Sequence, residues 1–177
     1  IQKLDKAESS SIVLDLYRNV GVGEGAKSLA LYSRSNAKVI SIFNVAEGIS
    51  SIPEFPLNRM AFNDMPIDTD NVVRRDLVGV NRKKYNLSAE YISVPMRMVE
   101  INQYLNRKKF DLEDEFYKNE IPLIKNFSGG YTNVDANGFQ IFINYPDKNY
   151  IPIYSLGDIL EDKISSELQS KYGSGNI

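Results

Sequence analysis

The chain has 177 residues, of which 42% are hydrophobic and 25% are charged, and its net charge is −2. A chain of this length and composition can bury a substantial core, and it lacks the low hydrophobicity and high charge of disordered segments. It contains no cysteine and no histidine, which excludes disulfides, thiolate metal sites and imidazole catalysis. The composition does not exclude an enzyme that uses carboxylates, lysine or tyrosine.

The sequence indicates neither a nucleic-acid-binding surface nor a membrane-spanning helix. Basic residues occur in short clusters such as Arg74-Arg75, whereas nucleic-acid binding requires a concentrated basic face, so we expect no nucleic acid as a partner. No apolar run approaches the roughly 20 residues of a membrane helix, and no signal peptide opens the chain. We therefore expect any membrane anchor to lie outside this chain.

The opening of the chain predicts a strand–helix–strand unit. Residues 1–8 are expected to be the end of a helix, and residues 11–17 form a β-branched apolar run typical of a buried strand. Apolar residues recur at helical spacing over residues 26–33, and residues 38–45 form a second buried strand. This order predicts parallel strands with a right-handed crossover.

The middle of the chain predicts a turn and then a helix. The polar residues 68–71 predict a turn that leads into a hairpin through Val72-Val73 and Leu77-Val78. From residue 89 to residue 105 the apolar residues recur at helical spacing, with Pro95 expected to kink the helix.

Asn137-Gly138 is the clearest local signal in the chain, because both residues accept positive φ in a tight turn. We expect this pair to join residues 131–134 to residues 139–145 in a hairpin. A final amphipathic helix over residues 155–168 is expected to be capped by Ser155. Together the elements predict an α/β fold, a mixed sheet with a parallel strand–helix–strand opening, a late antiparallel hairpin and flanking helices.

A glycine-rich segment, Gly21 to Ala26, fits the G-x-G-x-x-A pattern that holds a pyrophosphate in dinucleotide-binding proteins, and Glu47 lies near the distance expected for the ribose-binding acid. Residues 17–20 nevertheless separate the strand from the first glycine, where the pattern requires a tight turn. Glu24 would also place a negative charge beside the phosphates. We therefore predict a plain loop and no cofactor.

Two groups of carboxylates are candidates for a site. Asp15 lies in or at the carboxyl end of the first strand, where open α/β sheets usually bind ligands. A buried carboxylate is costly unless it is paired, so we expect a partner such as Arg18 or a backbone cap. Asp15 and Arg18 are the predicted ligand-binding residues, with a structural polar network as the alternative. Asp68 and Asp70 resemble the opening of a calcium loop, but the required glycine and glutamate do not follow, so we predict a turn and no metal site.

Several segments together resemble the type-two CHASE family, the cyclase/histidine-kinase-associated sensory extracellular domains of bacteria. The most specific is the turn from Asp68 to Arg75, which resembles the family's Asp-x-Asp-Gly-Val-Val-Arg-Arg turn, with Asn71 in place of glycine. Asparagine also tolerates the left-handed region, so the departure is mild. The order and spacing of the other segments agree with the family; they are residues 12–18, 27–30, 38–43, 62–64, 129–131, 135–145 and 154–160.

The resemblance implies a sensory, non-enzymatic domain on the extracytoplasmic (periplasmic) side of the cell membrane, as part of an integral membrane receptor. Such a domain receives a small-molecule or physical stimulus, acts as a homodimer and regulates a cytoplasmic kinase or nucleotide cyclase. The family's first strand and closing strand have no counterpart here, so we expect residues 1–177 to be a single sensor domain truncated at both ends.

Two other functions stay open at this point. One is a small α/β enzyme that binds a nucleotide or uses carboxylates, and the other is a pure interaction module. Cofactor binding to the chain would separate the enzyme from both other interpretations.

Overall fold

The computed structural model describes residues 1–6, 9–80, 91–108, 121, 123–128, 130–134, 138–146 and 151–163. The chain divides into two compact units, one formed by Ile1–Ile12 with Asn144–Ile177 and the other by Val13–Ile143. The second unit holds most of the described helices and strands.

A parallel sheet opens the fold, as the sequence predicts. It contains β1 (Ile12–Leu14), β2 (Val39–Phe43) and β3 (Met60–Phe62) in that order, and β2 pairs with β3 in parallel. Residues from Val39 to Ile42 are buried, and the β-branched composition of β2 suits a strand that is covered on both faces. Helix α2 (Ala26–Ser35) connects β1 to β2 and packs against β2.

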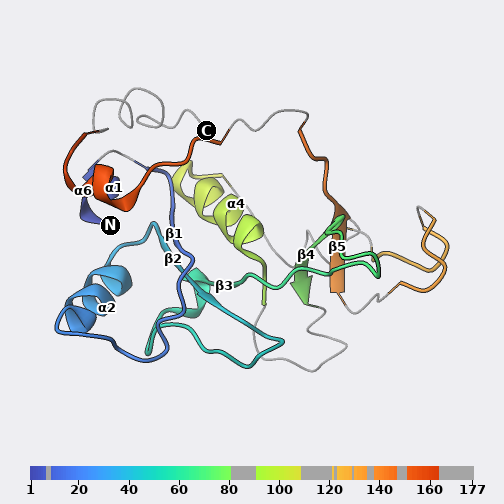
Figure 1. Cartoon of the computed structure of the whole chain (residues 1–177), viewed down its shortest axis with the longest axis horizontal. Helices are drawn as coiled ribbons and strands as arrows, with labels where there is room; N and C mark the ends of the chain where they lie inside the picture. The colour runs from blue at the N-terminus through green and yellow to red at the C-terminus, as the bar shows by residue number, and fades with distance from the viewer. Residues whose placement is uncertain are drawn as a thin grey trace. The chain divides into compact units, whose positions relative to one another are not determined.

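A late antiparallel pair follows, in which β4 (Arg75–Val80) lies beside β5 (Gly138–Phe142) (Figure 1). The predicted partner of β5, residues 131–134, is wrong, because the structure pairs β5 with a strand far upstream. Val78 and Phe139 lie in one buried cluster, and this burial explains the long-range pairing. The hairpin predicted around residues 72–78 is likewise replaced by the single strand β4.

Gly138 is the first residue of β5 and does not lie in the predicted turn. Among the described glycines, positive φ occurs at Gly23, Gly48 and Gly130, so the expectation of positive φ at Gly138 is wrong. A Cβ at Gly138 would lie 2.5 Å from Leu77 Cδ1 and 2.7 Å from the Gly79 carbonyl oxygen. Glycine is required here because the two strands approach closely. Asn137, its predicted turn partner, lies outside the described residues.

Residues 91–93 join the two sheets, although the sequence predicts no strand there. Phe62 forms a parallel bridge with Ser93, and Gly79 forms an antiparallel bridge with Ile92. The Phe62 amide donates to the Ile92 carbonyl at 3.0 Å, and the Ser93 amide donates to the Val78 carbonyl at 3.0 Å. Among the residues that the structure describes, the strands β1 to β5 are thereby connected into one mixed array.

Helix α4 (Val94–Leu105) begins directly after this connecting segment. The Ser93 side chain caps the helix by accepting from the Met96 amide. Pro95 lies in the first turn, where its missing N–H would have had no helical partner, so the predicted kink at Pro95 is wrong. The helix packs on β2, β3 and β4, and its Ile101 lies in a buried cluster with Ile40.

The unit formed by the two ends of the chain contains the short helices α1 (Gln2–Lys6) and α6 (Leu156–Leu160). Ser155 caps α6 as predicted, since its hydroxyl accepts from the Asp158 amide at 3.0 Å. The Lys3 ammonium donates to the Leu160 carbonyl at 2.5 Å and to Asp162 at 2.7 Å. The last part of the predicted helix, from residue 164, lies outside the described residues. No helix within the described ranges has both the length and the apolar character needed to cross a bilayer.

We predict that Gly138→Ala destabilises the domain by about 1–3 kcal/mol, because the added methyl group forces β5 away from Leu77 and the Gly79 carbonyl. Urea denaturation followed by circular dichroism measures this change. Gly25→Ala is the matched control, because a Cβ there meets open space, and its effect should stay within about 0.5 kcal/mol. Equal stabilities of the two variants would contradict the close approach.

Candidate functional site

The turn that precedes β4 has the geometry of a short closed loop. The Asp68 amide donates to the Val72 carbonyl at 3.0 Å, and the Asn71 amide donates to the Asp68 carbonyl at 2.9 Å. Asn71 has a φ of +63°, a region that asparagine enters at lower cost than most residues. The turn therefore presents the side chains of Asp68 and Asp70 toward the two arginines that follow.

Asp68 is the centre of a charged cluster. Its carboxylate is only 8% exposed and accepts hydrogen bonds from the Tyr131 hydroxyl at 2.6 Å, Arg75 Nη2 at 2.8 Å and Arg74 Nη1 at 3.1 Å. The bond from Tyr131, followed by that from Arg75, lowers the pKa of Asp68 to about 2. The carboxylate is therefore ionised over the whole physiological pH range.

Arg75 connects this turn to the late part of the chain. Its side chain is 7% exposed, and besides Asp68 its guanidinium donates to Gln140 Oε1 in β5 at 2.7 Å. The guanidinium carbon also lies 4.6 Å from the centroid of the Tyr131 ring, a cation–π distance. The Tyr131 ring in turn contacts the Phe142 ring, with 5.9 Å between centroids. One buried cation thus joins the turn, β5 and residues 130–134.

Asp76, which follows Arg75 in β4, has a pKa shift opposite in direction to that of Asp68. Asp76 is buried, and its desolvation raises the pKa of the Asp76 carboxyl. Consecutive residues of a strand point to opposite faces, so Asp76 lies on the other face of β4 from Arg75. Burial therefore favours the neutral form of the Asp76 carboxyl. The Asp68 carboxylate is buried as well, but the groups that donate hydrogen bonds to it favour its ionised form.

The outer part of the cluster is an ion pair between Arg74 and Asp70. Arg74 Nη1 and Nη2 each donate to one oxygen of Asp70 at 2.7 Å, which is a bidentate arrangement. The two side chains are 46% and 54% exposed. An exposed pair of this kind contributes little to stability, so the two groups can separate at low cost where each receives a new partner of opposite charge.

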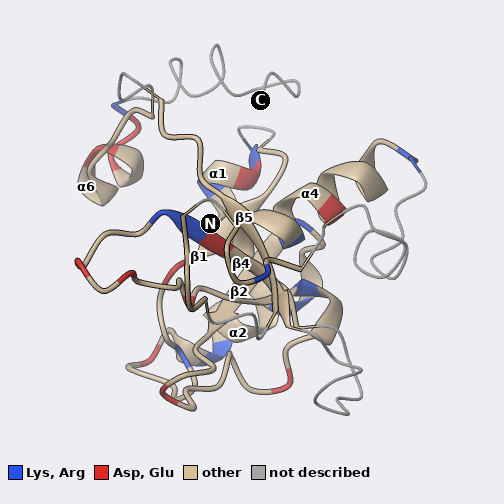
Figure 2. Ribbon diagram, turned by 90° about the vertical axis from the view of Figure 1, so that its right-hand side faces the viewer, with Lys and Arg blue, Asp and Glu red and all other residues tan. Residues whose placement is uncertain are grey.

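The cluster forms one wall of an open hollow of about 890 Å³. Its apolar surface comes from Ile67 and Phe142, which are 63% and 50% exposed. Neutral polar side chains complete the lining and are Thr69, Thr132 and Asn133. Lys and Arg are interspersed with Asp and Glu along the described ribbon (Figure 2), and the hollow likewise contains both signs of charge. In the part of the chain that the structure describes, no group of three or more residues is arranged to hold a metal ion.

The predicted ligand residues Asp15 and Arg18 lie elsewhere. Asp15 follows β1 directly, as expected, but it is exposed and accepts from Asn63 Nδ2 at 3.1 Å. The Arg18 guanidinium donates to the carbonyl of its neighbour Tyr17 at 3.4 Å, and the two described side chains form no ion pair with each other. The suggested pairing of Asp15 with Arg18 is wrong, because the amide of Asn63 takes the position of the partner.

Other polar side chains at this edge of the parallel sheet hold loops. Tyr17 donates to Asn63 at 3.0 Å and accepts from Asn44 at 3.2 Å. Asp64 accepts from the Val45 amide at 2.9 Å and from the Ala46 amide at 3.0 Å. These bonds form a structural polar network at this edge, and a ligand-binding role of Asp15 and Arg18 stays a prediction.

The glycine-rich segment also differs from a dinucleotide loop. β1 ends at Leu14 and α2 begins at Ala26, so residues 15–25 separate the strand from the helix. A dinucleotide fingerprint instead passes from strand to helix in a tight turn. The segment therefore does not place its amides as that fingerprint does.

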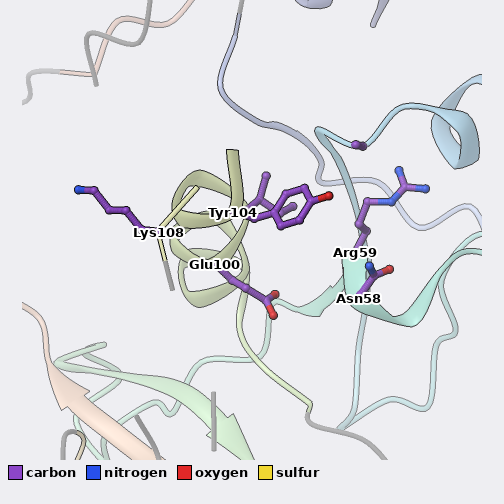
Figure 3. A pocket seen from close by; sticks show the side chains of 7 residues that line it. Asn58, Arg59, Glu100, Tyr104 and Lys108 are labelled. Carbon is purple, nitrogen blue, oxygen red and sulfur yellow. The ribbon is translucent and has the colours of Figure 1, made fainter. Parts of the chain in front are cut away.

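A second hollow, of about 290 Å³, lies between α4 and the short 3₁₀-helix η1 (Leu57–Arg59). Figure 3 shows Tyr104 extending from α4 toward Arg59, whereas Lys108 extends the other way. Arg59 is buried and donates to the carbonyls of Ser33, Arg34 and Asn36 at the end of α2, so its charge stabilises the helix C-terminus.

Glu100, on the α4 side of this second hollow, is likewise bonded within the fold. It pairs with Arg97, whose Nε donates to the Met60 carbonyl at 3.0 Å. The second hollow, of about 290 Å³, is smaller than the hollow of about 890 Å³ at the Asp68 cluster, and we therefore take the larger one as the candidate site.

The cluster around Asp68 brings together two segments that the sequence linked to one family. One is the turn at residues 68–75, and the other comprises residues 130–131 and 138–142. The fold is of mixed α/β architecture, with an open hollow beside the charged cluster. A comparison with protein families matches residues 1–174 to the CHASE2 domain, so the chain belongs to the CHASE2 family of sensory extracellular domains. Searches among curated proteins and among solved structures gave no significant match.

Sequence reasoning did not select Arg74, Arg75, Tyr131 or Gln140 as site residues. The available signal was the resemblance itself, since both segments that meet at the cluster carried it. Nothing local in either segment indicates that they lie side by side.

We predict that Asp68→Asn reduces the acid sensitivity of the domain. Since the pKa of Asp68 falls from 3.8 to about 2 on folding, its contribution to stability is complete above pH 3.8 and is lost as the pH falls toward 2. Asparagine cannot titrate, so the free energy of unfolding of the variant should change less over this pH range. Urea denaturation at a series of pH values measures the slope.

Tyr131→Phe is the matched variant, because it keeps the Asp68 carboxylate and removes its first donor. Its slope should lie between those of the unmodified chain and Asp68→Asn. If the free energy of unfolding changes equally with pH in all three proteins, these donors do not lower the pKa of Asp68.

Proposed function

We propose that this CHASE2 domain is the signal-input domain of a bacterial membrane-bound receptor and lies on the extracytoplasmic side. In this proposal, segments outside this chain anchor the receptor, and a cytoplasmic effector, a kinase or a nucleotide cyclase, carries out the chemistry. The observation that supports it most is the family match over residues 1–174, since CHASE2 domains are sensory and extracellular. The open hollow at the charged cluster supports a role in binding a stimulus.

The connections of the cluster suggest how occupation of the hollow is transmitted. Arg75 is the first residue of β4 and bonds to β5 through Gln140. β4 also contacts α4, which begins at the segment bridging β3 and β4. A ligand that prefers one arrangement of the cluster would shift the population of the connected strands and helix.

The proposed receptor acts as a homodimer and involves no nucleic acid. In a dimer, a small change in each domain alters the distance or angle between the two chains that lead to the effector. A domain without this coupling would bind its ligand and leave the effector unchanged, so ligand binding and effector output are separate observables.

The side of the membrane on which the domain lies can be tested with a single introduced cysteine, because the chain has no cysteine of its own. Thr132→Cys places a thiol on an exposed residue of the hollow. In intact cells that carry the full receptor, with any cysteines in its other parts replaced, a membrane-impermeant maleimide should label this variant. Labelling that appears only after lysis would contradict an extracytoplasmic domain.

Signal input is tested by removing residues 1–177 from the full receptor and measuring effector turnover. We expect the effector to stay catalytically competent and to lose its response to growth conditions that alter the intact receptor. An unchanged response would contradict the proposed role.

A further inference from the structure

The hollow beside the turn at residues 68–75 presents a balanced set of charges. Asp68 and Arg75 lie at its base and are almost completely buried against each other. Asp70 and Arg74 lie at its rim, and about half of each side chain is exposed. A ligand in the hollow therefore meets one accessible carboxylate and one accessible guanidinium, which are adjacent.

A simple anion fits this arrangement poorly. To bind Arg74 it would have to compete with Asp70, which holds the guanidinium through two bonds of 2.7 Å. The displaced Asp70 would then lie unpaired beside a second negative charge. The terminal nitrogens of Arg75 already donate to Asp68 and Gln140. Its Nε has no hydrogen-bond partner but is buried, so an anion could reach this guanidinium only by displacing one of its two partners.

A simple cation fits no better. It could approach Asp70 only by displacing Arg74, which would then lie beside a like charge with Asp68 as its remaining carboxylate partner. The ring of Tyr131 could otherwise hold a cation, but the guanidinium of Arg75 lies over that ring at 4.6 Å. That face of the Tyr131 ring is therefore already occupied by a cation of the protein.

We propose that the hollow binds a small zwitterion, a molecule with an ammonium group and a carboxylate on one compact body, such as a free amino acid. The carboxylate would take the fork of Arg74 and the ammonium would take Asp70, so both groups exchange one ionic partner for another. This inference rests on the proposed signal-input role, because it names the chemical class of the stimulus.

The remaining lining indicates what the body of the ligand resembles. Ile67 and Phe142 expose apolar surface to the hollow, which favours an aliphatic or aromatic side chain. Thr69, Thr132 and Asn133 add neutral hydrogen-bonding groups without further charge. Amino acids with apolar side chains should therefore bind more tightly than those with charged side chains.

The test is calorimetry of the 177-residue chain with the common amino acids, added one at a time. We expect saturable binding that is strongest for an apolar amino acid such as leucine. Isopentylamine and isocaproate, which each keep one of leucine's two charged groups, should bind at least about tenfold more weakly. Inorganic phosphate, at the same concentration, should not bind.

Two substitutions locate the site. Arg74→Gln and Asp70→Asn should each weaken leucine binding by about tenfold or more. Arg34→Gln is the matched control, because Arg34 forms an ion pair with exposed Glu54 outside the hollow, and it should bind leucine like the unmodified chain. Melting curves of all variants show whether each is folded.

Three results would overturn the inference: no amino acid binds, phosphate or isocaproate binds as tightly as leucine, or the folded Arg74→Gln and Asp70→Asn variants retain full affinity. Effector output plays no part in this test. If the chain binds leucine but the output of the receptor never changes, the signal-input proposal is wrong and the zwitterion site stands. If the receptor responds but this domain binds no zwitterion, the zwitterion site is wrong and the signal-input proposal stands.

Discussion

The buried ion pair between Asp68 and Arg75 is the interaction on which the arrangement of the candidate site depends. A charge inside a protein is tolerated only when a partner and additional hydrogen bonds compensate for its lost hydration. Asp68 obtains these from Arg74, Arg75 and Tyr131, and Arg75 obtains them from Asp68 and Gln140. Removal of Asp68 would take away the carboxylate partner of Arg75, and removal of Arg75 would leave Asp68 with Arg74 and Tyr131. The pair therefore holds the turn, β5 and residues 130–134 together.

Much of the fold could be predicted because the signals were local. The β-branched run of β2 and the helical spacing of α2 predict the parallel opening, and Ser155 predicts the start of α6. β3 was missed because its three residues are too few to show a period. The predicted partner of β5 was wrong because the real partner is determined by the burial of Phe139 with Val78. The local turn residues carry no information about this long-range contact.

The candidate site was harder to predict than the fold. Asp15 was selected from its position at the end of a strand, and the structure shows that position but gives Asp15 an amide partner and an exposed side chain. The residues of the cluster come from segments more distant in sequence, and neither Tyr131 nor Gln140 has a local pattern that marks it. Only the resemblance of both segments to one family connected them before the fold was known.

A double-mutant cycle on Asp68 and Arg75 tests the central claim most directly. The free energy of unfolding would be measured by urea denaturation at neutral pH for Asp68→Asn, Arg75→Gln and the double variant. If the two side chains depend on each other, the double variant loses clearly less stability than the sum of the single losses. Additive losses would show that the buried pair does not hold the site together.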